Sequence, residues 1–209
     1  VYVAYVYEAD GALLPRVAAF DINGTLKWDV HYFYGATAAY PSALYYDNGT
    51  LYLLCFVLMS GESDYDLYLM PLDPSDGRPL GQWIMGKDLV NEIGGDLVVE
   101  GDEAWILSSR MDGADSDVIL IRLILSEGIY STIRVLKDPE IREIGMRLLK
   151  AGLSFYMLVS RVKPGIPGES DYVVLKTTMY RPQLIASTNV VSPLTLELLP
   201  PALEIMWNI

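Results

Sequence analysis

The sequence predicts an all-β fold, and three observations carry the prediction. Tyr, Val, Ile and Leu recur in short apolar runs along all 209 residues, which favours strands over helices. Gly, Pro, Asn and Asp separate those runs, as turns between strands require. A pattern of strands and turns also recurs four times, at a spacing of about fifty residues.

The first unit is the shortest of the four. Strands are expected at residues 1–7, 16–21 and 25–30. An acidic turn at 8–11 separates the first two strands, and Asn23-Gly24 separates the last two. Asn-Gly supplies positive φ angles, so type I′ hairpin turns are predicted here and at Asn48-Gly49.

Units two to four repeat this order with one more strand in front. The strands expected in the second unit cover 42–46, 51–59, 67–72 and 80–85. Those of the third cover 97–100, 104–110, 118–125 and 129–136, and those of the fourth cover 146–150, 153–162, 172–178 and 184–191. Helical turns are expected between units, at 87–93 and 138–144. Tyr2, Tyr52, Trp105 and Phe155 are taken as equivalent positions of the repeat.

Four antiparallel strands per unit of about fifty residues form a propeller blade. We therefore expect one β-propeller-like domain over residues 1–209, with units at about 1–32, 41–86, 96–137 and 145–191. The apolar tail 194–209 is expected to supply a strand that closes the ring beside residues 1–7. A two-sheet β-sandwich is the alternative for short, evenly spaced strands.

Two segments resemble the blade motif of PQQ-like propellers, in which a strand ending in Asp leads through a Gly turn to a strand ending in Trp. They are residues 19–28, with Asp21 and Trp28, and residues 69–83, with Asp73 and Trp83. The third and fourth units lack the Trp. The resemblance implies a fold rather than a reaction, because propellers serve as scaffolds, receptors and enzymes.

Acidic residues gather between the same two strands of each unit, so a propeller would bring them to one face. They are Glu8, Asp10, Glu62, Asp64, Asp66, Asp112, Asp115, Asp117, Glu169 and Asp171. Asp112, Asp115 and Asp117 are the densest group and the candidate ligands for Ca²⁺, which prefers oxygen donors. The alternatives are attraction of a partner, with Glu62, Asp64, Asp66, Glu169 and Asp171 as contacts, or simple solvation of hairpin loops.

The connection after the first unit is aromatic. His31, Tyr32, Phe33, Tyr34 and Tyr40 lie in it, beside the acidic loops. These rings are candidates for contact with a protein or a carbohydrate. The alternative is that they seal the gap between two blades.

Composition excludes several classes of function. A net charge of −12 without a basic cluster argues against nucleic acid and anionic membranes. Apolar runs are too short for the roughly 20 residues of a membrane span. Cys55 is the single cysteine and is expected to be buried and inert. Few Asn, Gln and Cys residues suit a thermophilic source.

The leading interpretation is a non-enzymatic binding or scaffold module that presents its acidic loop face, with an extracellular or cell-surface location favoured. One alternative is a hydrolase, glycoside-cleaving or metal-assisted, that uses the loop carboxylates. No nucleophile elbow, Walker loop or zinc-protease motif is present to name a catalytic residue. The other alternative is a structural subunit that donates its C-terminal strand to the next copy.

Overall fold

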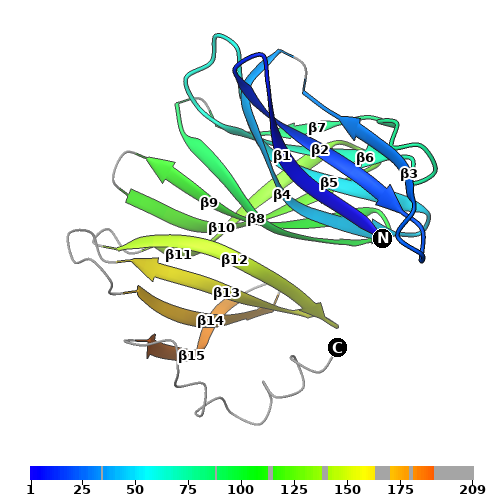
Figure 1. Ribbon diagram of the computed structural model, residues 1–209. Coiled ribbons are helices and arrows are strands. Elements are labelled where there is room, and N and C mark those ends of the chain that lie inside the picture. The colour runs from blue at the N-terminus through cyan, green and yellow to red at the C-terminus, as the bar shows by residue number, and fades with distance from the viewer. Residues whose placement is uncertain are drawn as a thin grey trace.

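The computed structural model describes residues 1–33, 35–87, 89–112, 115–137, 141–162, 170–178 and 181–190. The regular secondary structure of these residues consists of β-strands alone, which confirms the all-β prediction (Figure 1). The strands form three sheets, and nearly all of their pairings are antiparallel.

The first sheet contains two blades. Blade 1 consists of β1 (Tyr2–Ala9), β2 (Ala12–Phe20) and β3 (Leu26–His31). Blade 2 consists of β4 (Ala36–Asp47), β5 (Thr50–Met59), β6 (Asp66–Leu72) and β7 (Trp83–Met85). One parallel residue pair, Leu13 with Ala38, joins the two blades.

Each of the other two sheets is one four-stranded blade. Blade 3 consists of β8 (Asn91–Glu100), β9 (Glu103–Asp112), β10 (Asp115–Ile124) and β11 (Ile129–Lys137). Blade 4 consists of β12 (Arg142–Ala151), β13 (Ser154–Val162), β14 (Ser170–Thr178) and β15 (Arg181–Val190). The strands of each blade follow chain order across the sheet.

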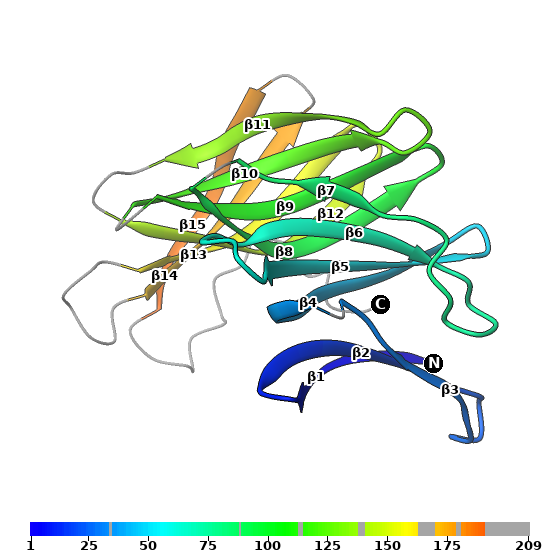
Figure 2. The same cartoon turned by 90° about the horizontal axis from the view of Figure 1, so that it is seen from above.

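The blades fan out from their first strands, β4, β8 and β12, which lie side by side near the middle of the molecule (Figures 1 and 2). Blades 1 and 4 are the two ends of this arc. The fold is therefore propeller-like, with blade 1 built from the three strands that correspond to the second, third and fourth strands of the other blades.

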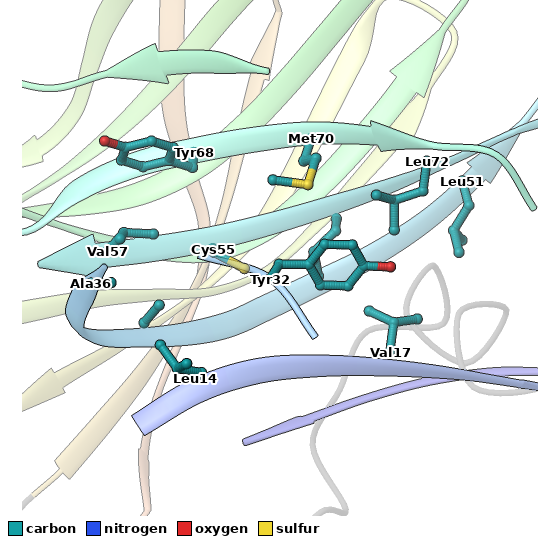
Figure 3. Close-up of a cluster of buried hydrophobic side chains, with 12 residues drawn as sticks. Leu14, Val17, Tyr32, Ala36, Leu51, Cys55, Val57, Tyr68, Met70 and Leu72 are labelled. Carbon is teal, nitrogen blue, oxygen red and sulfur yellow. The ribbon is translucent and has the colours of Figure 1, made fainter. Parts of the chain in front are cut away.

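Apolar clusters fill the spaces between successive blades. Figure 3 shows the first of them, where Leu14 and Val17 of β2 face Leu51, Cys55 and Val57 of β5. A second cluster joins blades 2 and 3, and a third joins blades 3 and 4. Burial of these side chains is the main source of stability, at about 25 cal/mol per Å² of apolar surface.

Each blade has two different faces. We call the face toward the following blade the front and the face toward the preceding blade the back. Counting from the tight turns after β8 and β12, Trp105 is equivalent to Tyr156, not to Phe155 as the repeat suggested. Trp105 lies on the front of blade 3, and Phe155 packs against it from the back of blade 4.

Two Trp–Gly contacts also link blades. The Trp28 side chain of blade 1 lies against Gly77, in the turn between β6 and β7 of blade 2. Its Nε1–H donates a hydrogen bond to the carbonyl of Pro74 in the same turn, at 3.0 Å. Trp83 of blade 2 lies beside Gly128, in the turn between β10 and β11 of blade 3, where a Cβ atom would be 3.6 Å from Trp83 Cδ1.

The first strands of the blades are longer than predicted. β4, β8 and β12 extend through residues that we expected to be connections or helical turns, namely 36–41, 91–96 and 142–145. Each strand contains a β-bulge, at Pro41, Gly94 or Gly145. A bulge breaks the alternation of side chains, and Gly and Pro are poor strand formers, so the pattern was hidden.

The two Asn-Gly turns differ. Asn48 and Gly49 both have positive φ, at 42° and 84°, as type I′ requires. At Asn23-Gly24 only Gly24 has positive φ, so the predicted type I′ turn is wrong there. The turn is held instead by Asp21, whose carboxylate accepts hydrogen bonds from the amides of Asn23 and Thr25, both at 2.9 Å.

Candidate functional site

The edge of the molecule that carries the β1–β2 and β5–β6 loops is the candidate functional face, and we call it the loop face. Because the blades repeat the same antiparallel order, the ends of β9 and β13 and the starts of β10 and β14 also lie along it (Figure 1). The links between blades start and end on the same side.

Exposed carboxylates of the loop face have no cationic partner within the described ranges. Glu8 and Asp10 are exposed in the β1–β2 hairpin, and Glu62 is exposed after β5. Asp64 is half-buried and accepts a hydrogen bond from the Ser63 hydroxyl at 3.2 Å. None of these four side chains takes part in an ion pair found in the described residues.

The turns on the opposite edge are also acidic, and most of their carboxylates pair with a cation, whereas Asp47, Asp102 and Glu127 take part in no ion pair found in the described residues. Lys27 lies 3.3 Å from Asp21, and Arg78 lies 3.6 Å from Asp73. Further pairs there are Arg122 with Glu103 and Lys150 with Glu100. The negative charge of the two edges is therefore balanced unequally.

A buried row of three charged residues crosses the back of blade 3. Arg110 of β9 lies directly between Glu92 of β8 and Asp117 of β10. The Arg110 Nε is 3.0 Å from Glu92 Oε1, and Glu92 is 1% exposed. Burial raises the pKa of Glu92, and the Arg110 hydrogen bond and charge only partly oppose that rise.

Blade 4 repeats this row at the same register. Arg161 of β13 lies between Glu143 of β12 and Asp171 of β14. Its Nε is 3.4 Å from Glu143 Oε1, and Glu143 is 0% exposed. In blade 2 the corresponding residues are Ala39, Val57 and Asp66, so the acidic residue of the third strand is retained without the Glu–Arg pair.

Ser116 of blade 3 fixes the position of the second row. Its hydroxyl donates to the Glu143 carbonyl at 3.1 Å and accepts from the Glu143 amide at 2.7 Å. The neighbouring Gly145 amide donates to the Ser109 hydroxyl at 2.9 Å. Hydroxyls of blade 3 thus bind the backbone of β12 across the interface between the two blades.

The candidate metal ligands are placed differently from the prediction. Asp117 is 6% exposed and belongs to the Glu92–Arg110–Asp117 row rather than to the loops. Asp112 and Asp115 face each other at the ends of β9 and β10, and their side chains are outside the described part. Among the described residues, no group of three His, Cys, Asp or Glu side chains is arranged to hold a metal ion.

The candidate partner contacts also divide. Asp66 and Asp171 stand in the cross-strand positions given above, whereas Glu62 and Asp64 lie on the loop face. Glu169 and Tyr34 are outside the described residues.

Tyr32 is buried, which corrects its assignment as a contact for a partner. It is 3% exposed, and its hydroxyl donates to the Gly77 carbonyl at 2.8 Å. Burial raises the pKa of the Tyr32 hydroxyl far above its usual value. His31 is half-buried and its ring lies 5.5 Å from that of Tyr7.

Another aromatic group lies at the loop end of the interface between blades 2 and 3. Tyr40 of β4 stacks on Phe56 of β5 at 5.1 Å, and Tyr65 meets Phe56 edge-on at 5.7 Å. All three rings are half-buried. Tyr65 also ties the blades together, because its amide donates to the Asn91 side chain and its carbonyl accepts from the Glu92 amide.

The sequence analysis missed the Glu–Arg pairs, although a signal for them exists. Glu-Ile-Gly occurs at 92–94 and again at 143–145, and Ser-Arg occurs at 109–110 and again at 160–161. Each dipeptide or tripeptide is short, and the pairing becomes visible only once the strand register is known.

Cys55 is not a candidate nucleophile. Its side chain is 0% exposed, and burial raises the pKa of the thiol well above its ordinary value. Among the residues that the structure describes, there is no helix long and apolar enough to cross a membrane.

Comparison with known proteins supports the fold. No family and no curated protein matches the sequence. Among solved structures, the chain is similar to the Bacteroides ovatus protein "Xyloglucan PUL GH43B", a glycoside hydrolase propeller, with a TM-score of 0.51 and 14% sequence identity. The match covers 91% of this chain and 40% of that one. The chain is thus an all-β, propeller-like protein that spans less than half of its structural neighbour.

Proposed function

We propose that the protein is a propeller-like binding module whose loop face takes a basic partner. The observation that carries the proposal is the contrast between the two edges. Most carboxylates of the opposite edge pair with Lys or Arg, whereas Glu8, Asp10 and Glu62 are exposed without such partners in the part of the chain that the structure describes.

Unbalanced charge on one face has a physical consequence. It attracts cations over a distance of about 8–10 Å at moderate salt and speeds the encounter with a basic ligand. The net charge of −12 adds to the same field. This type of recognition gives partner selection and a fast association rate more than high affinity.

A salt-dependent binding experiment tests the proposal. An oligolysine peptide labelled with a fluorophore is titrated with the protein, and its anisotropy is followed at low and moderate salt. The variant Glu8→Gln/Asp10→Asn/Glu62→Gln should bind several-fold more weakly. The matched control removes three charges from the opposite edge, as Asp47→Asn/Asp76→Asn/Glu127→Gln. Equal loss in both variants would mean that net charge, not the loop face, governs binding.

A glycoside-cleaving hydrolase is the second candidate. The likeness to a glycoside hydrolase propeller favours it. The most buried carboxylates on the first strands, Glu92 and Glu143, are paired with Arg110 and Arg161, so they are not poised as an acid and a base. Release of reducing ends from a panel of neutral polysaccharides, xyloglucan included, distinguishes this candidate from the binding module.

The repeat type is also a proposal. The Trp28–Gly77 and Trp83–Gly128 contacts join successive blades through the residues that resemble the PQQ-like motif. They support the assignment of blades 1 and 2 to that type of repeat. The closing or donated C-terminal strand, residues 194–209, lies outside the described residues and stays a prediction.

A further inference from the structure

The back face of blade 1 differs from the back faces of the other three blades. Val3 is 44% exposed and Tyr5 is 36% exposed. Tyr2 pairs with the residue two before Asp21, as Tyr52 pairs with the residue two before Asp73. Val3 and Tyr5 are therefore equivalent to Leu53 and Cys55 of blade 2. These two side chains and their equivalents in blades 3 and 4 are all 0% exposed: Leu53, Cys55, Ile106, Ser108, Met157 and Val159.

Those equivalent side chains are buried because the front of the preceding blade covers them. Met157 and Val159 belong to the cluster that contains Trp105 and Leu107 of blade 3. Ile106 belongs likewise to the cluster with residues of blade 2. The Val3–Tyr5 surface thus stands where another blade covers the equivalent positions elsewhere in the same chain, and it also carries Asp29, which is paired with Arg16 and accepts a hydrogen bond from the Tyr5 hydroxyl.

The front face of blade 4 is also exposed where the front faces of the other blades are covered. Leu149 and Ile144 of β12 are 43% and 40% exposed. The equivalents of Leu149 in blades 2 and 3 are Tyr45 and Val98, and both pack toward the following blade. Leu149 pairs with Tyr156, which occupies the position of Trp105. An aromatic side chain therefore stands where an interface ring is expected.

We propose that two copies of this chain associate head to tail, with the front of blade 4 of one copy against the back of blade 1 of the next. All three internal interfaces join a front to a back, and the described chain has one uncovered face of each kind. The contact continues the packing rule that the chain already uses. It is a heterologous contact, which forms rings when the rotation closes and filaments when it does not.

A complementation experiment tests this geometry. Val3→Glu places a charge on the back of blade 1, and Leu149→Glu places one on the front of blade 4. Light scattering after size exclusion should show concentration-dependent multiples of 23.3 kDa for the natural chain and a monomer for each variant. An equimolar mixture of the two variants should give a dimer, because each retains the face that the other lacks. Ile22→Glu, at a turn residue that is 97% exposed, is the control that should assemble normally.

Several outcomes would overturn the proposal. A natural chain that stays at the monomer mass at every concentration means that these faces are covered within one chain or by a different protein. A mixture that remains monomeric, while both variants keep their β-sheet circular dichroism, means that the contact does not join these two faces. If Val3→Glu does not fold, Tyr5→Lys on the same face takes its place in the mixture.

Discussion

The rings of Trp105 and Phe155 meet across the interface between blades 3 and 4, with centroids 4.5 Å apart and planes inclined by 42°. Trp105 is 1% exposed and Phe155 is 0% exposed. Contact between them adds about 0.5–1.5 kcal/mol to the burial of the two side chains. This pair is the centre of the cluster that holds the last blade on the arc.

Phe155→Ala should therefore destabilise the protein by about 3–5 kcal/mol. The change removes the ring and leaves a cavity beside Trp105 that surrounding strands can fill only in part. Urea unfolding followed by Trp fluorescence measures the loss. Leu153→Ala, two residues away and 75% exposed, is the control and should change stability by no more than about 0.5 kcal/mol. Equal effects would show that blade 4 does not depend on this contact.

Gly77→Ala tests the Trp–Gly contact between blades 1 and 2. Gly77 has φ of 77°, and a Cβ atom there would lie 2.7 Å from Cε3 and Cζ3 of Trp28. Positive φ alone costs a non-Gly residue about 1–3 kcal/mol, and displacement of the Trp28 ring adds to this cost. Chemical unfolding of the variant gives the total.

Gly49→Ala separates the two contributions. Gly49 has φ of 84°, but a Cβ atom added there would meet no other atom within 4 Å. It therefore reports backbone strain without a clash. If Gly77→Ala is no more destabilising than Gly49→Ala, the contact with Trp28 contributes nothing beyond the turn.

The blades could be predicted from the sequence because their turns are chemically explicit. Asn48-Gly49 and the Asp73–Gly77 turn mark strand ends by φ preference and by side-chain hydrogen bonds, which are local effects. The first strands were underestimated because Gly94 and Gly145 lie at bulges. A bulge depends on close approach between strands, as where Gly95 lies beside the Gly145 carbonyl, and no local pattern reports it.

The candidate site was predicted less well, for a related reason. Asp66, Asp117 and Asp171 were grouped with the loop acids because they follow them directly in the sequence. In the structure they start or continue the third strand of a blade, and for Asp117 and Asp171 the residue directly across is an Arg. Whether a carboxylate is free or opposite a guanidinium is decided by strand register. An error of one residue in the register, such as the alignment of Trp105 with Phe155 instead of Tyr156, assigns a side chain to the opposite face of its blade.

Glu92 should make stability depend on pH. Its folded-state pKa is raised by burial, so the folded protein holds this proton more firmly than the unfolded chain does. Stability from this group is complete below the unfolded-state pKa and is lost as pH rises through the folded-state pKa. Relative to Glu92→Gln, the natural protein should lose unfolding free energy as the pH rises from the ordinary Glu pKa through the raised folded-state pKa.

Urea unfolding of both proteins at several pH values gives the difference in slope. In Glu92→Gln, Arg110 loses its carboxylate partner, which changes the unfolding free energy by the same amount at every pH measured. The slope against pH is therefore the informative quantity. Glu100→Gln, at a side chain that is 67% exposed, serves as the control. Parallel curves for the natural protein and Glu92→Gln would contradict the raised pKa.

Cys55 should react with a thiol reagent only when the protein unfolds. The side chain is fully buried among Leu53, Val57 and Tyr32 in the first interblade cluster, and its pKa is raised by burial. Both effects lower the concentration of accessible thiolate, which is the reactive form. Labelling with Ellman's reagent should be slow in buffer and fast in concentrated urea.

The labelling rate in buffer then reports opening between blades 1 and 2, and Gly77→Ala should raise that rate because the variant loosens the same interface. Fast labelling of the natural protein without denaturant would show that this interface opens readily and that the cluster around Cys55 does not close it.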